Sequence, residues 1–326
     1  MAPAAAGGFF ELSAQAKERT PPPLGVKGQI IGPVSFGTSL CDRNGKAIFY
    51  DPQLREAFVQ LLALRARWQV RRLSALKRPV LLFIDDPAIT GFGSSMYIGL
   101  NREDICQSLG AMIDAVHREG GLAGVHICAN ADWTLVLDSA ADILSFDAYA
   151  FFDQFVIYRE AIRRFVDRGG LIAWGLVPTL SPQDLQRETV DSLLAQWEAK
   201  SAQVAALGVD PHRLLAQSLI TPACGMGTLS VERALEALSM LSPKHFNAVM
   251  APGSAGAAVM GAFMHSVTRD IFLDELGDDE SLLWQAFLVK KPELAPAAPS
   301  AAQVAGPGPV PVEKISTAPP EKAPAA

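Results

Sequence analysis

Residues 122 to 132 read LAGVHICANAD, an apolar run that ends in His126-Ile127-Cys128 and continues into a polar loop. A short apolar run without polar alternation is typical of a strand that is buried on both faces. His126 and Cys128 are two positions apart, so in a strand their side chains point to the same side of the sheet. The stretch therefore predicts a buried strand that presents an imidazole and a thiol at its carboxyl end.

Similar apolar runs recur from about residue 24 to residue 246 and alternate with helical periodicity. We predict strands at Val26–Gly32, Val80–Asp85, Ala123–Cys128, Ile143–Asp147, Leu171–Val177 and Leu214–Thr221. We predict helices at Pro52–Ala75, Arg102–Glu119, Trp133–Ala140, Phe155–Asp167, Ser181–Ala206 and Ser230–Leu241. Apolar strands separated by helices are typical of a parallel sheet covered on both faces, so the predicted class is α/β.

Each predicted strand is followed by a loop that is polar or contains Gly or Pro. The loops read GPVSFG, DDPAITGFG, CANAD, DAY, VPT and TPACGMG. The carboxyl ends of parallel strands lie at one edge of a sheet or barrel, and ligands bind there. Taken singly, each loop is also compatible with an ordinary turn between strand and helix. Six such loops in series, several with reactive side chains, favour a shared binding site.

The composition excludes several classes of protein. With 326 residues, 49% of them hydrophobic, and a net charge of −6, the chain has ample core-forming material for a soluble globular protein. It has no Lys/Arg-rich block outside an amphipathic stretch, so we expect no nucleic-acid partner. We find no signal peptide, and the longest uncharged apolar stretch, 248–264, is too short to span a membrane. The expected location is the cytoplasm, with no membrane partner.

The sequence predicts four regions along the chain. Residues 1–23 form a weakly structured N-terminal segment, and 24–246 form the α/β domain. Residues 247–291 are predicted to be helical. Residues 292–326 are rich in Pro and Ala and cannot bury enough apolar surface to offset their ordering entropy, so they are predicted to form a disordered tail.

The cysteines at positions 41, 106, 128 and 224 are too sparse for a disulfide framework. Cys224 follows the last predicted strand, and a parallel fold would bring it close to His126 and Cys128. Two thiolates and an imidazole are a typical set of Zn²⁺ ligands that leaves a fourth position for substrate or water. The alternative is a packed cysteine beside a hydrogen-bonded histidine, since cysteine is among the most buried residue types.

A resemblance to a known family rests on six blocks of sequence in order. They are GVKGQIIGPVSFG, LLFIDDPAI, GVHICANADW, DILSFDAY, GGLIAWGLVPT and LITPACGMGTLSVERALEAL. Together they resemble motifs of the superfamily of cobalamin-independent methionine synthase and uroporphyrinogen decarboxylase. The nearest likeness is to short single-barrel proteins related to the catalytic domain of methionine synthase. The resemblance covers residues 24–246 and implies a (β/α)₈ barrel of the TIM type.

The resemblance also implies a metal site. His126, Cys128 and Cys224 match the His-x-Cys and Cys zinc ligands of the methyltransferase branch. Asp147 stands near the place of a fourth ligand, which is a glutamate in the methionine synthases. Because Asp is one methylene shorter than Glu, hydrogen bonding to His126 is an alternative role for Asp147.

Further residues are expected to contact substrate. Asp85 and Asp86 match a carboxylate pair that grips the amino group of the substrate in the family. A helix-capping turn is the alternative interpretation of this pair. Trp133 and Tyr149 are predicted to line the pocket. Alternatively, they pack at the rim of the strand ends without contacting a ligand.

The chain departs from the family at its start. Six strands are predicted where the barrel needs eight, and the first unit of the family, with its Gly-Ser-Leu/Phe-Pro segment, has no counterpart before Val26. The expected fold is therefore a TIM-type barrel that lacks its first one or two β/α units, or one completed by residues 246–290.

The expected activity is zinc-dependent transfer of a methyl group to a small thiol such as homocysteine. Only a thiolate attacks a methyl group well, and Zn²⁺ lowers the thiol pKa from about 8.5 so that the thiolate persists at neutral pH. The donor is methyl-tetrahydrofolate or a methylated corrinoid (cobalamin) protein. Two alternatives stay open: a decarboxylase acting on a carboxylated substrate such as a porphyrinogen, and a degenerate barrel that binds a metal or a partner without turnover.

Overall fold

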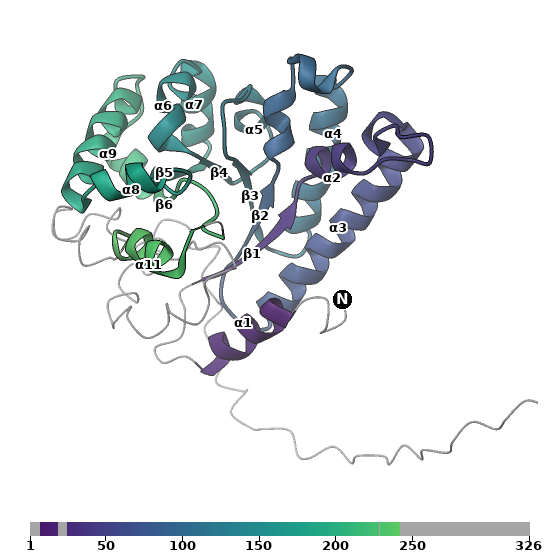
Figure 1. The fold of residues 1–326 in the computed structure, drawn as a ribbon, viewed down its shortest axis with the longest axis horizontal. Helices are drawn as coiled ribbons and strands as arrows, with labels where there is room; N and C mark the ends of the chain where they lie inside the picture. Colours follow the sequence, from purple (N-terminus) through teal and green to yellow (C-terminus); the bar gives the residue numbers. More distant parts are fainter. Residues whose placement is uncertain (1–6, 19–24, 228, 242–326) are drawn as a thin grey trace, which may run out of the picture. The chain divides into compact units, whose positions relative to one another are not determined.

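The computed structural model describes residues 7–18, 25–227 and 229–241. Within them, six strands form one parallel sheet in the order β1-β2-β3-β4-β5-β6 (Figure 1). The strands are β1 (Val26–Ile31), β2 (Val80–Asp85), β3 (Leu122–Ile127), β4 (Ile143–Phe146), β5 (Leu171–Val177) and β6 (Ser218–Pro222). The predicted α/β class is confirmed.

The strand order explains why the sheet curls. Each strand pairs with the strands that come before and after it in the sequence. Right-handed crossovers between sequential neighbours place their helices on the same face of the sheet, as in a barrel. The sheet is therefore a curled half-barrel with an inner face. Among the described residues β1 pairs only with β2 and β6 only with β5, so they contain no closed eight-stranded barrel.

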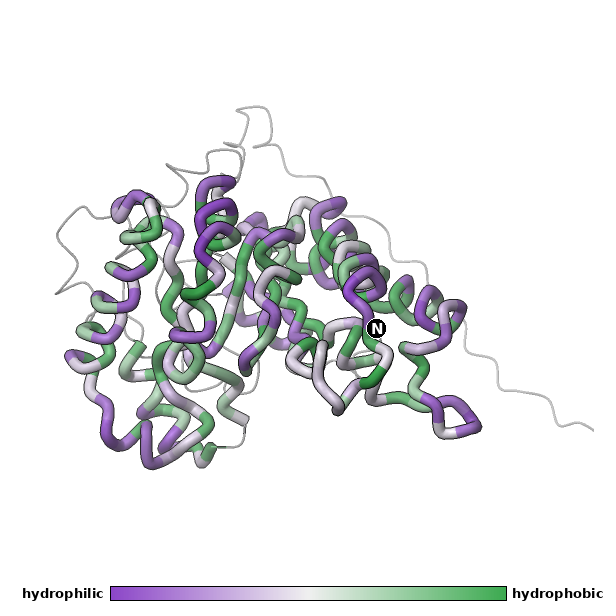
Figure 2. The backbone as a smooth tube through the Cα atoms, turned by 90° about the horizontal axis from the view of Figure 1, so that it is seen from above, coloured by the Kyte–Doolittle hydropathy of each residue, from purple (hydrophilic) through white to green (hydrophobic). Residues whose placement is uncertain are grey.

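The helices occupy the intervals between the strands and flank them at both ends. They are α1 (Gly7–Glu18), α2 (Pro33–Ser39), α3 (Pro52–Ser74), α4 (Arg102–His117), α5 (Thr134–Leu137), α6 (Ala148–Phe155), α7 (Arg159–Asp167), α8 (Pro182–Arg187), α9 (Val190–Ala205), α10 (Pro211–Ala216) and α11 (Val231–Ser239). Short 3₁₀ turns lie at Ile48–Tyr50, Pro87–Gly91 and Ser95–Tyr97. In Figure 2 the helices show alternating hydrophilic and hydrophobic sides, as expected of helices that cover a sheet.

Four predicted elements are wrong in their extent. The helix predicted at Trp133–Ala140 covers only Thr134–Leu137. The other three differ because capping side chains interrupt the apolar periodicity. The strand predicted at Leu214–Thr221 begins only at Ser218, since Asp210 caps α10 before it. The single helix predicted at Ser181–Ala206 is two helices, because Thr189 caps α9 through the backbone N–H of Ser192.

The last of these differences lies after β4. The helix predicted at Phe155–Asp167 begins only at Arg159, as α7, and an additional helix, α6, precedes it and ends at Phe155. Asp147 starts α6 directly at the strand end by accepting a hydrogen bond from the backbone N–H of Ala150. Residues 148–154, for which the sequence predicts no helix, therefore belong to a helix over the carboxyl end of β4.

The N-terminal segment, predicted to be weakly structured, contains α1. The Phe9 ring lies 4.9 Å from the ring of Trp68 on α3, and the Arg72 guanidinium lies 5.7 Å from the Phe10 ring. These contacts dock α1 against α3. The regions predicted at 247–291 and 292–326 lie outside the described residues. None of the described helices is both long enough and apolar enough to cross a membrane.

The core nearest the candidate site is aromatic. Trp133, Phe146 and Phe155 pack with ring centroids 4.3 to 5.8 Å apart. Trp174 of β5 extends the cluster, and its indole N–H donates to the Ser218 hydroxyl at 3.0 Å. Aromatic side chains of this size anchor β4, β5 and β6 to their helices, which fixes the strand ends relative to one another.

Candidate active site at the strand ends

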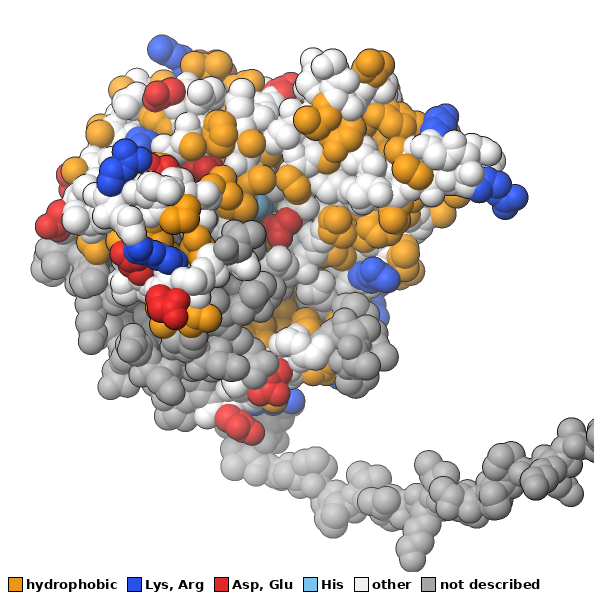
Figure 3. Space-filling model, in the orientation of Figure 1, with side chains coloured by type: hydrophobic (Ala, Val, Ile, Leu, Met, Phe, Trp, Pro, Cys, Tyr) orange, Lys and Arg blue, Asp and Glu red, His pale blue; other side chains and the backbone are white. Residues whose placement is uncertain are grey.

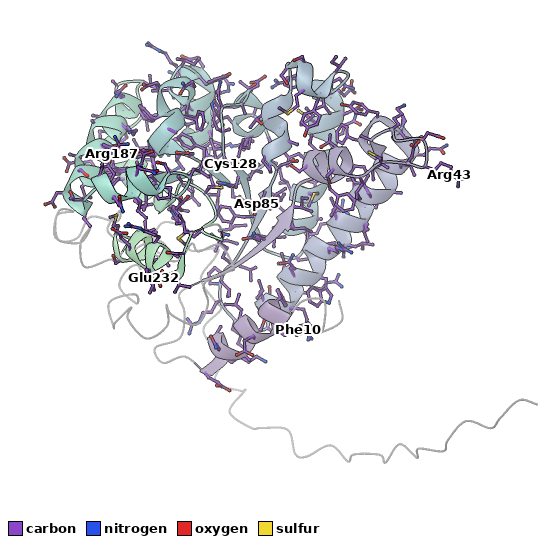
Figure 4. The ribbon with its side chains drawn as sticks, in the orientation of Figure 1. Phe10, Arg43, Asp85, Cys128, Arg187 and Glu232 are labelled. Carbon is purple, nitrogen blue, oxygen red and sulfur yellow. The ribbon has the colours of Figure 1, made fainter. Side chains whose placement is uncertain are left out.

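Strand register places three polar side chains in one row on the inner face of the sheet. Asp85 of β2 is paired with His126 of β3, and His126 is paired with Ser145 of β4. Residues paired in register point to the same face. In Figure 4 the labelled Asp85 and Cys128 lie close together near the carboxyl ends of the strands. Figure 3 shows a histidine beside an acidic side chain in the middle of the same view.

The structure brings the three proposed zinc ligands together. Cys128 follows β3 directly and Cys224 follows β6, and the two thiols are linked by a side-chain hydrogen bond. His126 is close enough to Cys224 to lower the pKa of its thiol. His126 is only 5% exposed, whereas both cysteines are half-buried, so solvent reaches the thiols but hardly the imidazole.

The two thiols influence each other's ionisation. The nearby Cys128 and His126 side chains lower the pKa of the Cys224 thiol, whereas Cys224 and burial raise the pKa of the Cys128 thiol. A hydrogen bond donated to a thiolate favours the charged form, while the donor holds its proton more tightly. The two thiols therefore titrate as a coupled pair, in which the environment favours the charged form of Cys224 over that of Cys128.

Two side chains that sequence analysis missed hold these groups in place. The Ser145 hydroxyl lies 2.9 Å from Nδ1 of His126. The Thr179 Oγ1 accepts a hydrogen bond from the backbone N–H of Cys224 at 3.0 Å and donates to the Cys224 carbonyl at 3.1 Å. Ser145 could have been found from its strand position, since it stands two residues before Asp147. Thr179 follows β5, and only the fold shows that it meets Cys224.

Asp147 lies at the edge of this cluster and caps α6. Its Oδ1 accepts a hydrogen bond from the Ala150 N–H at 2.8 Å. Burial raises the pKa of the Asp147 carboxyl, the negative charge of Cys224 raises it further, and the Ala150 hydrogen bond opposes the shift. Nδ1 of His126 is held by Ser145. The Asp147 carboxylate thus places negative charge beside the thiols, while its Oδ1 accepts the capping hydrogen bond of α6.

The neighbouring carboxylates Asp85 and Asp86 point in different directions. Asp86 is fully buried, and it accepts hydrogen bonds from the Val34 N–H at 2.9 Å, the Ser35 N–H at 2.7 Å and the Ser35 hydroxyl at 2.6 Å. It therefore holds the first turn of α2, which lies about 50 residues earlier in the sequence, and it makes no side-chain capping hydrogen bond to the 3₁₀ turn Pro87–Gly91 that follows it. Burial raises the pKa of the Asp86 carboxyl to about 6 despite these hydrogen bonds.

Asp85 is the carboxylate that faces the cluster. It is half-buried, and among the described residues its Oδ1 has no hydrogen-bond partner. Burial raises the pKa of its carboxyl, whereas the charges of His126 and Lys27 oppose this shift. Of the two carboxylates, only Asp85 has an oxygen available for a ligand.

The two aromatic residues predicted at the pocket lie in different environments. Trp133 is fully buried in the aromatic cluster, where its ring contacts Phe146 and Phe155. Tyr149, on the first turn of α6, is half-buried and donates a hydrogen bond from its hydroxyl to Glu188 at 2.8 Å. Burial and this contact raise the pKa of Tyr149 to about 12. Trp133 is thus a core residue, and Tyr149 ties α6 to the start of α9.

The buried hydrogen bonds of Asp86 should contribute measurably to the free energy of unfolding. Asp86→Ala should lower the free energy of unfolding at pH 7 by about 2 to 4 kcal/mol, because it leaves buried donors at the start of α2 without an acceptor. The matched control, Asp85→Ala, should cost less than about 1 kcal/mol, since none of the described residues donates a hydrogen bond to Asp85 Oδ1 and its side chain caps none of the described helices. Denaturant titration measures both. Equal losses in the two variants would contradict the assignment of Asp86 as the cap.

The raised pKa of Asp86 determines how the free energy of unfolding changes with pH. Because the pKa of Asp86 is about 6 in the folded protein and 3.8 without the fold, the native state binds the proton more tightly. Its contribution to stability is fully present below pH 3.8 and is lost as the pH rises through 6, by at most about 3 kcal/mol. Asp86→Asn should remove this slope between pH 4 and pH 6.

The described residues contain no group of three or more His, Cys, Asp or Glu side chains in a metal-holding arrangement. The His126, Cys128 and Cys224 side chains lie near one another and affect the ionisation of the thiols. Metal binding requires the thiols to lose their protons, since the thiolate form is the ligand.

Comparisons with known proteins add little to this picture. No protein-family model matches the sequence. A stretch of 56 residues, 17% of this chain, is 43% identical to a part of the acyl-homoserine lactone acylase QuiP of Pseudomonas aeruginosa. The match covers 6% of that protein, so it carries neither fold nor activity over to this chain.

Proposed function

We propose that the protein is a zinc-dependent methyltransferase that methylates a small thiol such as homocysteine. The observation that supports this most directly is the contact of His126, Cys128 and Cys224, which come from the ends of two strands far apart in the sequence. We further propose that the six strands are six of the eight of a TIM-type barrel. The strand order, the curl of the sheet and the strand-end position of the cluster support this.

The donor set suits zinc chemically. Two thiols and an imidazole are preferred Zn²⁺ ligands, and three protein ligands leave a position for the substrate sulfur. When bound, zinc would lower the pKa of the substrate thiol so that its nucleophilic thiolate form is populated at neutral pH.

The chain's own residues have separate tasks in this proposal. Ser145 orients the His126 imidazole, and Thr179 fixes the backbone of Cys224, as supporting hydrogen bonds do around metal ligands. Asp85 accepts a hydrogen bond from the ammonium group of the substrate with its available oxygen. Asp147 adds negative charge, which keeps the site electron-rich and preserves the nucleophilicity of a thiolate.

A methylated corrinoid protein is the donor that the surface favours over free methyl-tetrahydrofolate. Met96, Ile98 and Leu180 lie in the loops that follow β2 and β5, on the edge where the candidate site lies. Their side chains are 74%, 82% and 62% exposed. Exposed large apolar side chains near a binding site are typical of a protein-docking surface.

Metal content and methyl transfer test the proposal. We expect about one zinc per chain by elemental mass spectrometry, as three protein ligands require. We also expect methionine to form from homocysteine when methylcobalamin is supplied. Protein that contains no zinc after purification in zinc-supplemented buffer and forms no methionine would overturn it. Porphyrinogen decarboxylation by the metal-free protein would establish the alternative activity instead.

A further inference from the structure

Lys27 is a charged residue on the inner face of the sheet that the proposed activity leaves unused. It lies on β1, paired in register with Leu81, whose neighbours on the same face of β2 are Phe83 and Asp85. Its Nζ donates to Gln29 Oε1 at 3.3 Å and lies 4.8 Å from the centre of the Phe83 ring. Lys27 is half-buried. The ammonium group therefore faces the interior of the half-barrel.

This ammonium group forms no ion pair among the described residues, where no carboxylate oxygen lies within 4.0 Å of Nζ. Burial lowers the pKa of Lys27 to about 8, and the charge of Asp85 only partly offsets this. A half-buried cation held by an amide oxygen and a ring face costs folding free energy that an ion pair would recover. Two of its three N–H donors are available for an anionic ligand.

Asp85 and Lys27 present opposite charges on the same face of the sheet. The Phe83 ring that Nζ approaches stands two residues before Asp85 on β2, which is about 7 Å along the strand. Their charges influence each other's pKa, yet they are too far apart for a direct ion pair. An α-amino acid carries an ammonium and a carboxylate on the same carbon. With a hydrogen bond of about 2.8 Å at each end, it spans groups up to about 8 Å apart. A zwitterion therefore matches the pair, with its ammonium on Asp85 and its carboxylate on Lys27.

We propose that Lys27 binds the carboxylate of the amino-acid substrate and makes the site specific for amino-acid thiols over simple aminothiols. This inference rests on the proposed function for the kind of substrate. Lys27 is thus a specificity-determining residue that contacts a part of the substrate remote from the reacting sulfur. Its loss affects recognition of the carboxylate and leaves the thiols and the imidazole unchanged.

The test compares the binding of two ligands that differ only in the carboxylate. The probes are L-methionine and 3-(methylsulfanyl)propan-1-amine, which is methionine without its carboxylate, titrated calorimetrically into the full-length protein. The wild type should bind methionine about 10- to 100-fold more tightly, as expected for one charged hydrogen-bonding contact. Lys27→Met should bind the two ligands within about threefold of each other. Lys27→Arg should keep most of the preference, since it remains cationic.

Two controls make the result interpretable. Lys46→Met removes an exposed lysine far along the chain from β1 and should keep the wild-type preference. Thermal unfolding shows whether Lys27→Met is folded, and its melting temperature should not fall, since a buried charge has been removed. A folded Lys27→Met that still prefers methionine overturns the proposal, as does a wild type without preference.

The outcomes separate this inference from the proposed function. A preference for methionine that depends on Lys27, in a protein that transfers no methyl group, would support the carboxylate site and overturn the methyltransferase. Methyl transfer with a preference unchanged in Lys27→Met would support the methyltransferase and overturn the role of Lys27.

Discussion

Replacing Cys128 and Cys224 together with serine should abolish zinc binding and methyl transfer. The hydroxyls of serine do not ionise near neutral pH, so His126 alone would remain as a strong ligand. Loss of supporting residues around a metal already costs about 10- to 100-fold, so loss of two ligands should reduce methyl transfer by more than about 100-fold. Elemental analysis should show zinc falling below about a tenth of an equivalent.

The other two cysteines provide the matched control for this experiment. Cys41 and Cys106 are exposed free thiols, the first in an isolated bridge with Ala47 and the second on α4. Cys41→Ser combined with Cys106→Ser should keep wild-type zinc content and activity. Zinc that persists in the Cys128/Cys224 double variant at the wild-type level would show that the metal is held elsewhere.

Gly175→Ala should destabilise the protein by about 3 kcal/mol or more and disturb the candidate site at the same time. A Cβ at Gly175 would lie 2.5 Å from the Phe146 carbonyl oxygen, 2.7 Å from the Ala223 Cα and 3.2 Å from the Asp147 Cα. These are backbone atoms, which cannot turn aside as a side chain can. The strand ends that carry Asp147 and Cys224 would have to move apart.

Chemical denaturation and zinc titration measure the two effects of this substitution. Gly110→Ala is the control, because a Cβ at this position in the middle of α4 meets nothing within 4 Å. It should stabilise the protein by up to about 1 kcal/mol, since alanine is the better helix former. If Gly175→Ala is as stable as the wild type and retains its zinc affinity, the close approach of β4, β5 and the end of β6 does not position the site.

Much of the fold follows from the sequence. The bounds predicted for β2 and β5 coincide with the observed strands. Those of β1 and β4 differ by one residue at one end, and those of β3 by one residue at both ends. Strands buried on both faces are apolar throughout, so the sequence marks them clearly. The errors lie in helices after β4, β5 and before β6, where Asp147, Thr189 and Asp210 start new helices within apolar stretches.

The sequence alone also determined part of the candidate site. The two-residue spacing of His126 and Cys128 puts both side chains on one face of β3, and the parallel arrangement predicts that Cys224 approaches them. These features depend only on strand periodicity and on the direction of neighbouring strands.

Only the tertiary structure decided which side chains and backbone groups contact the residues of the candidate site. Asp85 and Asp86 are adjacent carboxylates in the sequence. The sheet register turns Asp85 toward His126, while the return of the chain at α2 brings two backbone N–H groups to Asp86. Thr179 likewise meets Cys224 only because β5 and β6 pair and end together. Such contacts join residues distant in the sequence, so they are set by the packing of the strands and not by any local pattern.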